Sequence, residues 1–182
     1  PRLQWMELGS GTEADPFMIY NCRELQALNN DLDAYYELAG DVDCSDTVNW
    51  DNGKGFYPIA RDTGFNDGFG GSLDGANRKI SGLYINRPTE LGSGLFGKIR
   101  TGNVQNVNID SFNITGTSLS GTLSGMVQES SQIDKVSVVN SDVYAVRPSG
   151  DSRTGGAFGR VSESVIQDIV VKNTSIDGAD YY

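Results

Sequence analysis

The sequence contains no histidine among its 182 residues. This absence removes the commonest general base, the usual serine and cysteine triads, and most zinc and iron sites. The metallopeptidase motif His-Glu-x-x-His is therefore absent too. No apolar run is long enough to cross a bilayer, and no basic-then-apolar leader follows Pro1. We therefore expect a mature or excised segment, with any signal peptide or anchor outside it and no membrane insertion of its own.

Basic residues are also scarce, with 14 Lys and Arg against 24 Asp and Glu, so the net charge is −10. This balance disfavours nucleic acid and anionic membrane surfaces as partners. After Gly92 the helix-favouring residues Ala, Leu, Glu and Lys become rare, whereas Gly, Ser, Asn, Thr, Val and Ile dominate. That composition argues against helical repeats. The length and the 37% hydrophobic content allow one sizeable core, and we expect one structural domain.

The chain does contain a repeat. Three tetrads, residues 94–97, 122–125 and 156–159, close on Gly97, Gly125 and Gly159, and we expect these glycines at turns. Apolar residues follow the closing glycine at offsets 7, 10, 12 and 17 in the first and third copies, and one residue later in the second. The positions are Val104, Val107, Ile109 and Ile114; Ile133, Val136, Val138 and Val143; Ile166, Ile169, Val171 and Ile176.

Alternation of apolar and polar residues within each copy is strand behaviour, and units this short must stack to bury their apolar face. The repeat therefore predicts an all-β fold, a right-handed parallel β-helix (β-solenoid) of about five or six coils, roughly 25–30 Å long. We expect asparagines at turns between strands, where they can stack from coil to coil. They are Asn103, Asn106, Asn140 and Asn173.

Residues 1–55 do not share the repeat. Residues 17–20 and 35–39 read as strands, and Leu25, Leu28 and Leu32 share one helical face. Asn21 is placed as an N-cap, with Glu24 three residues later as in a capping box. We predict an N-terminal cap over 1–55, whose short helix lies over the open end of the solenoid and which is continuous with coils over 56–182. No such cap is evident at the other end, so we expect more coils in a larger parent protein.

Two cysteines, Cys22 and Cys44, lie in this cap. A disulfide between them would close a loop of about 20 residues and contribute roughly 3 kcal/mol. We predict that disulfide; the alternative is a pair of thiols in a reducing compartment. Asn113 and Asn173 begin N-glycosylation sequons. Together these features favour an exported, extracellular protein.

An ordered string of motifs spans nearly the whole chain. It includes Asp15-Pro16-Phe17, Leu25-Gln26-Ala27-Leu28, Gly55-Phe56-Tyr57-Pro58-Ile59, Phe69-Gly70-Gly71-Ser72 and Gly94-Leu95-Phe96-Gly97. This string resembles the N-terminal part of right-handed parallel β-helix surface proteins that carry the GLUG motif. Such segments occur in large bacterial and archaeal surface and adhesin-like proteins, and beside the protease domain of IgA-specific metallopeptidases. The chain departs from the pattern at residues 122–125, which lack the first Gly and the aromatic, and at Ala60, where Gly is common.

The resemblance implies a stalk, spacer or adhesive surface rather than a catalytic centre. We therefore expect a non-catalytic extracellular module whose partners are the rest of a larger surface protein or further copies of itself, together with cell-surface glycans or proteins. One alternative is a subunit of an extracellular filament that assembles through open β-helix ends. A second alternative is a polysaccharide-active enzyme or a glycan-binding module, because parallel β-helices include pectin lyases and polysaccharide hydrolases.

Asp41, Asp43 and Asp46 form the closest acidic cluster, as a carbohydrate-active site or a calcium loop would need. As a calcium loop the cluster lacks the sharp-turn Gly and the bidentate Glu, which are replaced by Asp46 and Asn52. We expect instead a turn whose Asp side chains bond backbone N–H groups, and we expect no cofactor, with Ca²⁺ as the alternative.

Aromatic residues cluster between residues 50 and 69. We expect Trp50, Phe56 and Phe69 to pack onto the first coils. Tyr57 and Phe65 are the candidates for an exposed glycan-binding platform, since sugar-binding surfaces use exposed aromatic rings. The insert at residues 147–154 contributes Arg147 and Arg153 as further glycan-contact candidates, because loops on a rigid scaffold often carry binding.

Overall fold

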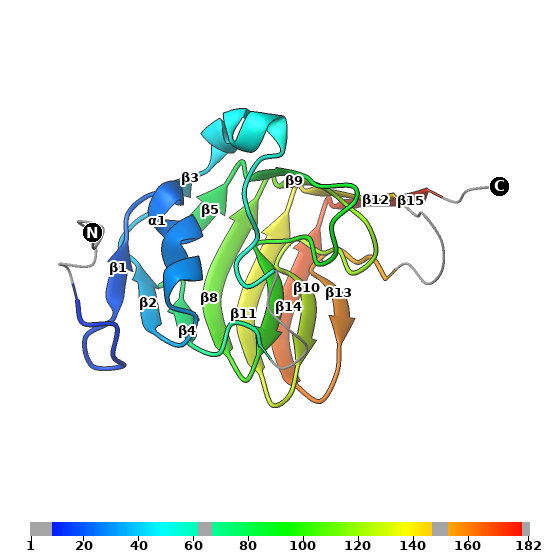
Figure 1. Cartoon of the computed structure of the whole chain (residues 1–182). Helices are drawn as coiled ribbons and strands as arrows, with labels where there is room; N and C mark the ends of the chain where they lie inside the picture. The colour runs from blue at the N-terminus through cyan, green and yellow to red at the C-terminus, as the bar shows by residue number, and fades with distance from the viewer. Residues whose placement is uncertain (1–8, 62–66, 147–152, 180–182) are drawn as a thin grey trace.

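The protein folds as a β-solenoid, in which successive turns of the chain stack their strands in parallel (Figure 1). A computed structural model describes residues 9–61, 67–146 and 153–179. The predicted all-β fold with one short N-terminal helix is confirmed.

Three parallel sheets form the walls. The longest comprises β1 Phe17–Ile19, β2 Tyr35–Leu38, β4 Ser72–Asp74, β8 Asn103–Asp110, β11 Gln132–Val139 and β14 Val165–Lys172, with β3 Val42–Asp43 and β5 Lys79–Ser81 alongside. The three-stranded sheet comprises β7 Phe96–Arg100, β10 Ser124–Gln128 and β13 Phe158–Val161. The four-stranded sheet comprises β6 Tyr84–Asn86, β9 Asn113–Gly116, β12 Asp142–Val146 and β15 Ser175–Ala179.

Within the described residues, three coils place a strand in every sheet, namely β7–β8–β9, β10–β11–β12 and β13–β14–β15. The prediction of five or six coils is therefore wrong for complete coils. The long sheet has six levels, but its first three have no strand in the three-stranded sheet. At those levels that wall is formed by the helix α1 (Cys22–Gln26) and by residues 56–60, which make only an isolated bridge, Ile59 to Phe96.

The register of the strands confirms the repeat alignment at all four apolar positions. Val104, Ile133 and Ile166 pair across β8, β11 and β14, and the other three sets pair in the same way. The one-residue displacement of the second copy lies in the turn after β10, where Glu129 and Ser130 both have positive φ. An extra turn residue leaves the strand register unchanged because the added length stays at the corner.

Each of the strands β8, β11 and β14 has one residue of positive φ, at the same position in every coil. Asn106, Lys135 and Asp168 occupy it, each with φ between 52° and 55°. Asn140 and Asn173 adopt similar φ at the next corner, where Asn173 Nδ2 donates to Asn140 Oδ1 at 3.4 Å. The prediction of turn asparagines that stack is confirmed at this corner. Asn103 and Asn106 are exceptions, because both lie within strand β8.

Gly97, Gly125 and Gly159 lie inside β7, β10 and β13, so the prediction that they are turn glycines is wrong. They are needed for close approach rather than for a turn. A Cβ at Gly97 would lie 2.5 Å from Arg61 Cα, and one at Gly125 would lie 2.5 Å from the Leu119 carbonyl oxygen. A Cβ at Gly159 would lie 2.6 Å from the Gly125 carbonyl oxygen.

The helix α1 begins where the capping residues predict. Asn21 Oδ1 accepts hydrogen bonds from the Arg23 and Glu24 amides at 3.1 Å, and Glu24 Oε2 accepts one from the Tyr20 amide at 2.7 Å. Leu25 is fully buried, as is Leu28 in the following 3₁₀ turn Ala27–Asn30 (η2).

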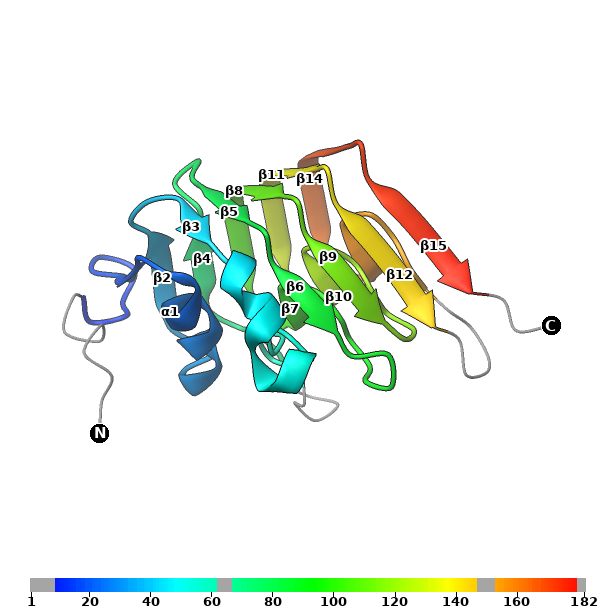
Figure 2. The same ribbon diagram turned by 90° about the horizontal axis from the view of Figure 1, so that it is seen from above.

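Figure 2 shows α1 on the opposite side of the coil from β2 and β4. Gln26 Oε1 accepts from the Tyr57 amide at 2.7 Å, and Asn29 Oδ1 accepts from the Ala60 amide at 3.0 Å. The Ile59 amide in turn donates to the Leu95 carbonyl oxygen at 2.9 Å, just before β7. Helix and segment thus cover the N-terminal edge of the three-stranded sheet. The exact boundary at residue 55 stays a prediction.

The predicted disulfide is present. Cys22, at the start of α1, and Cys44, just after β3, are bonded, with their Cα atoms 5.2 Å apart. Both residues are buried in the core. The bond therefore ties the helix to the long sheet inside the cap.

Aromatic rings run along the interior from level to level. The rings of Phe17, Tyr36, Phe69 and Phe96 follow one another with centroid separations of 5.7, 6.4 and 4.8 Å. Phe56 and Phe69 are fully buried, as predicted, and Trp50 is half-buried against the core. Burial, together with the nearby charge of Asp31, raises the pKa of Tyr36, whose hydroxyl donates to the Asp31 carbonyl oxygen at 2.6 Å.

The two ends of the interior differ. At the N-terminal end Phe17 and Ile19 are buried, whereas in the last coil Val171 is 42% and Ile176 is 50% exposed. The matched positions one coil earlier, Val138 and Val143, are 0% and 1% exposed. Among the described residues, nothing covers the apolar interior at the C-terminal end.

Candidate binding groove

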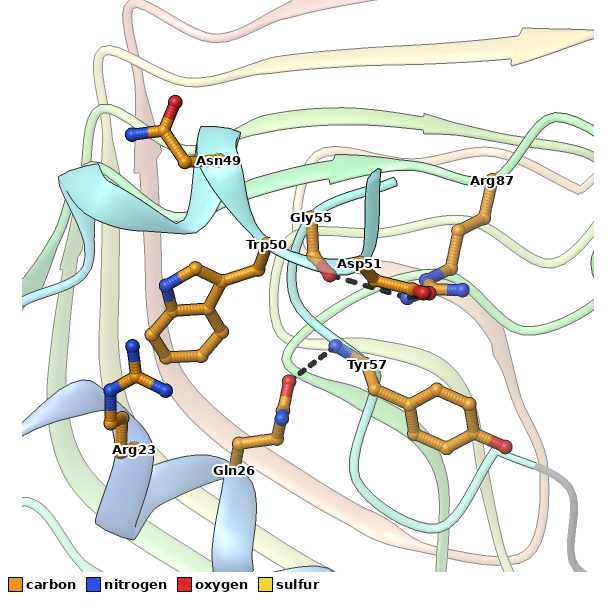
Figure 3. A pocket seen from close by; sticks show the side chains of 8 residues that line it. All are labelled: Arg23, Gln26, Asn49, Trp50, Asp51, Gly55, Tyr57 and Arg87. Atoms are coloured by element: carbon orange, nitrogen blue, oxygen red, sulfur yellow. Dashed lines mark hydrogen bonds and ion pairs between the residues drawn. The ribbon is translucent and has the colours of Figure 1, made fainter. Parts of the chain in front are cut away.

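A hollow of about 630 Å³ lies between α1 and the segment that follows the 3₁₀ turn Ser45–Asn49 (η3) (Figure 3). It is lined by Arg23, Gln26, Asn49, Trp50, Asp51, Gly55, Tyr57 and Arg87. A second hollow of about 350 Å³ shares Arg23, Gln26 and Tyr57 and follows η2. We call the two together the α1 groove.

Trp50 forms a flat wall of the groove. Its indole Nε1 donates to Asp46 Oδ2 at 3.0 Å, and Asn49 Nδ2 donates to Asp46 Oδ1 at 3.0 Å. These two bonds, that from Asn49 first, lower the pKa of Asp46, so its carboxylate is ionised and fixes the orientation of the ring. The Arg23 guanidinium lies over the ring, 4.9 Å from its centroid.

Arg87 organises the opposite wall. This side chain is buried; its Nε donates to the Phe56 carbonyl oxygen at 3.1 Å and its Nη2 to Asp51 Oδ2 at 2.7 Å. Nη2 also donates to the Gly55 carbonyl oxygen at 3.2 Å, and Nη1 donates to Glu90 at 3.1 Å. The bond from Arg87 lowers the pKa of Asp51. The groups around Arg87 therefore occupy its donors, and it holds residues 55–56 in place.

Tyr57 projects between two cations. Its ring centroid lies 4.5 Å from the Arg61 guanidinium and 5.2 Å from that of Arg87. Arg61 also forms an ion pair with Glu90. The predicted platform residue is thus half-buried and rigidly held, and it lines the groove rather than standing free of it.

Arg23 differs from these two arginines. Its side chain is exposed, and within the described part of the chain its guanidinium has neither an ion pair nor a hydrogen bond. Its charge interacts with that of Asp46, whose two oxygens accept from Asn49 and Trp50. The groove therefore presents a guanidinium with open donors that is held over the Trp50 ring.

In the acidic cluster only Asp43 accepts from a nearby backbone amide as predicted, since Asp41 bonds an amide 38 residues away and Asp46 bonds side chains. Asp41 Oδ1 accepts from the Lys79 amide and Asp43 Oδ1 from the Ser45 amide, both at 2.9 Å. The bond from Ser45 lowers the pKa of Asp43. Across the described ranges, no three His, Cys, Asp or Glu side chains gather as metal ligands would. A calcium ion at Asp41, Asp43 and Asp46 stays an untested alternative.

The remaining predicted residues are scattered. Phe65 and Arg147 lie outside the described residues. Arg153 is exposed and precedes β13, and its carbonyl oxygen accepts from the Ser120 amide at 3.0 Å. The sequon residues Asn113 and Asn173 are both exposed, the first at the start of β9 and the second at a corner.

Sequence reasoning missed Arg23 and treated Trp50 only as part of the packing. No local signal could have paired them, because their contact depends on how α1 is docked.

Within the described residues, no helix is long and apolar enough to span a membrane.

Comparison with known proteins gives one informative relation. A 101-residue stretch, 53% of the chain, is 41% identical to halomucin of Haloquadratum walsbyi. The chain spans about 1% of the length of that relative, which is a very much longer protein. No protein-family model matches the chain, and no solved structure matches it. The GLUG motif therefore stays a resemblance.

Proposed function

We propose that this chain is a non-catalytic extracellular module of a surface protein and forms coils of a rigid solenoid stalk. The observation that carries the proposal is the parallel stack of coils, in a chain half of which is similar to a very much longer protein. The interior is covered by α1 and its neighbours at the first level and is open at β14 and β15. A stack of coils suits a stalk, because each coil contacts only its neighbours and further coils can be added by the same parallel pairing.

Two further observations support an extracellular location. The relative's name is that of a mucin, a class of extracellular glycoprotein, and the similarity extends over about half of this chain. The Cys22–Cys44 disulfide suits an oxidising compartment, because cytosolic thiols are kept reduced.

A further coil of the same polypeptide is the occupant that best fits the open end. It would pair in parallel with β13, β14 and β15, as each coil pairs with the one before it. Apolar residues at the same offsets would then cover Val171 and Ile176. Burying these two half-exposed side chains would stabilise the stack by about 1 kcal/mol each.

The filament alternative requires the open end of one copy to pair with the N-terminal end of the next. In the three-stranded sheet that N-terminal edge is covered by residues 57–60 and by α1. A head-to-tail copy could not continue all three walls without displacing them. This argues for a continuing chain over self-assembly.

The test is an antibody against this segment, applied to intact and to permeabilised source cells and then to a denaturing gel. We expect labelling without permeabilisation and a band far above 19.6 kDa. A band near 19.6 kDa would contradict the longer stalk and favour association between copies. Labelling only after permeabilisation would refute the extracellular location.

A further inference from the structure

We propose that the α1 groove binds a carboxylated sugar residue of an acidic glycan, with the Arg23 guanidinium donating to the sugar carboxylate beside the Trp50 ring. The inference rests on the proposed extracellular location, where glycans are the abundant polymers. It names a ligand class for the adhesive surface that the stalk would present.

The first argument is the state of the arginines. Arg87 and Arg61 have their charges matched by Asp51 and Glu90. Arg23 interacts with the charge of Asp46 but forms no ion pair or guanidinium hydrogen bond with a described residue, and its planar fork suits a carboxylate through two parallel hydrogen bonds. Stacking on Trp50 holds the fork in place, so a ligand need not order it.

The second argument is the polarity of the walls beside Arg23. The Gln26 side chain uses its Oε1 to accept from the Tyr57 amide, which leaves its Nε2 facing the groove as a hydrogen-bond donor. Asn49 uses its Nδ2 on Asp46, which leaves its Oδ1 as an acceptor. Amide groups beside a guanidinium suit the hydroxyls of a sugar that carries a carboxylate.

The third argument is charge. The chain carries a net charge of −10, so most of its surface repels an anionic polymer. Four of its 14 basic residues nevertheless lie in or beside the groove: Arg23, Lys54, Arg61 and Arg87. The other three form ion pairs with Glu90 and Asp51, whereas Arg23 forms none with a described residue, so its donors stay available to an anion.

The sequence has two tryptophans, Trp5 and Trp50. The experiment uses a Trp5→Phe background, so that Trp50 is the one tryptophan left and its fluorescence reports on the groove. The probes are trigalacturonate, its neutral methyl ester and an acidic peptide of equal charge. The variants are Arg23→Gln and Arg23→Lys. Arg78→Gln is the matched control, because it removes the same charge from an exposed arginine between β4 and β5.

We expect a saturable change with trigalacturonate at millimolar concentrations and about tenfold weaker binding of the methyl ester. The Arg23→Gln variant should bind trigalacturonate about tenfold more weakly and should bind the methyl ester with unchanged affinity. Arg23→Lys should fall between, because lysine keeps the charge but loses the fork. Arg78→Gln should match the background protein within about twofold.

No saturable change, equal binding of the methyl ester, or undiminished binding by Arg23→Gln would overturn the proposal. Equally tight binding of the acidic peptide would also overturn it, because the groove would then recognise carboxylates in general and not a sugar. Should Arg23→Gln fail to fold by circular dichroism, the methyl ester comparison on the background protein decides alone. Failure here would leave the cell-surface labelling result untouched, so the two proposals are separable.

Discussion

Ile114 and Ile176 offer a matched test of the open C-terminal coil. They are the same residue at the same stack position, two coils apart, and pair through Val143. Ile114 is fully buried, whereas Ile176 is 50% exposed. Each is changed to alanine in the isolated chain, and the free energy of unfolding is measured by urea denaturation.

For Ile114→Ala we expect a loss of about 3 kcal/mol, because a fully enclosed side chain leaves a cavity. For Ile176→Ala we expect about 1 kcal/mol, since half of its surface is already in water and no enclosed cavity forms. The two variants should share one urea slope, which shows that the unfolded surface is unchanged. Equal losses would refute the reasoning, because Ile176 would then be covered in solution. Repeating the measurement over a wide range of protein concentration would show whether a second copy covers it.

Three further predictions concern the cap and the surface. Replacing Cys22 and Cys44 by serine should lower the free energy of unfolding by about 3 kcal/mol, seen as a lower urea midpoint that reducing agent no longer shifts. Asp51, whose pKa the Arg87 hydrogen bond lowers, stabilises the fold above its unfolded pKa, and that stability is lost as pH falls through the lower folded value. With no histidine to titrate, the urea midpoint should stay flat from about pH 8 to 5 and decline below about pH 4; a step near pH 6 would contradict this. Asn113 is exposed, so the native protein should carry a glycan there that Asn113→Gln removes from the intact mass; an unchanged mass would show an unused sequon.

The coils were predictable because four apolar positions in each copy specify the same strand register. A single apolar position such as Val107 could fit several strand pairings, but four matched offsets admit only one. The same redundancy made the extra residue beside Ser130 recognisable as a turn insertion. The cap helix was predictable for a different reason, because Asn21 and Glu24 act on the helix within one turn.

The number of complete coils could not be predicted, because the first levels replace strands by α1 and by residues 56–60. Gly97 was misassigned because a glycine in a tetrad reads as a turn, whereas its requirement comes from Arg61 across the coil. The groove was the least accessible feature. Arg23 and Trp50 meet only because the disulfide and the Gln26 bond to the Tyr57 amide fix where the helix docks.

The disulfide also has a mechanical consequence for a stalk. Tension on the two ends of such a chain would unwind coils and lengthen it, but the loop between Cys22 and Cys44 is bypassed by the covalent bond. The 22 residues of separation would otherwise add roughly 75 Å of contour length, while the bonded Cα atoms stay 5.2 Å apart. The loop contains β2 and β3, which would therefore carry no load and could re-form the first levels of the long sheet as the force is released.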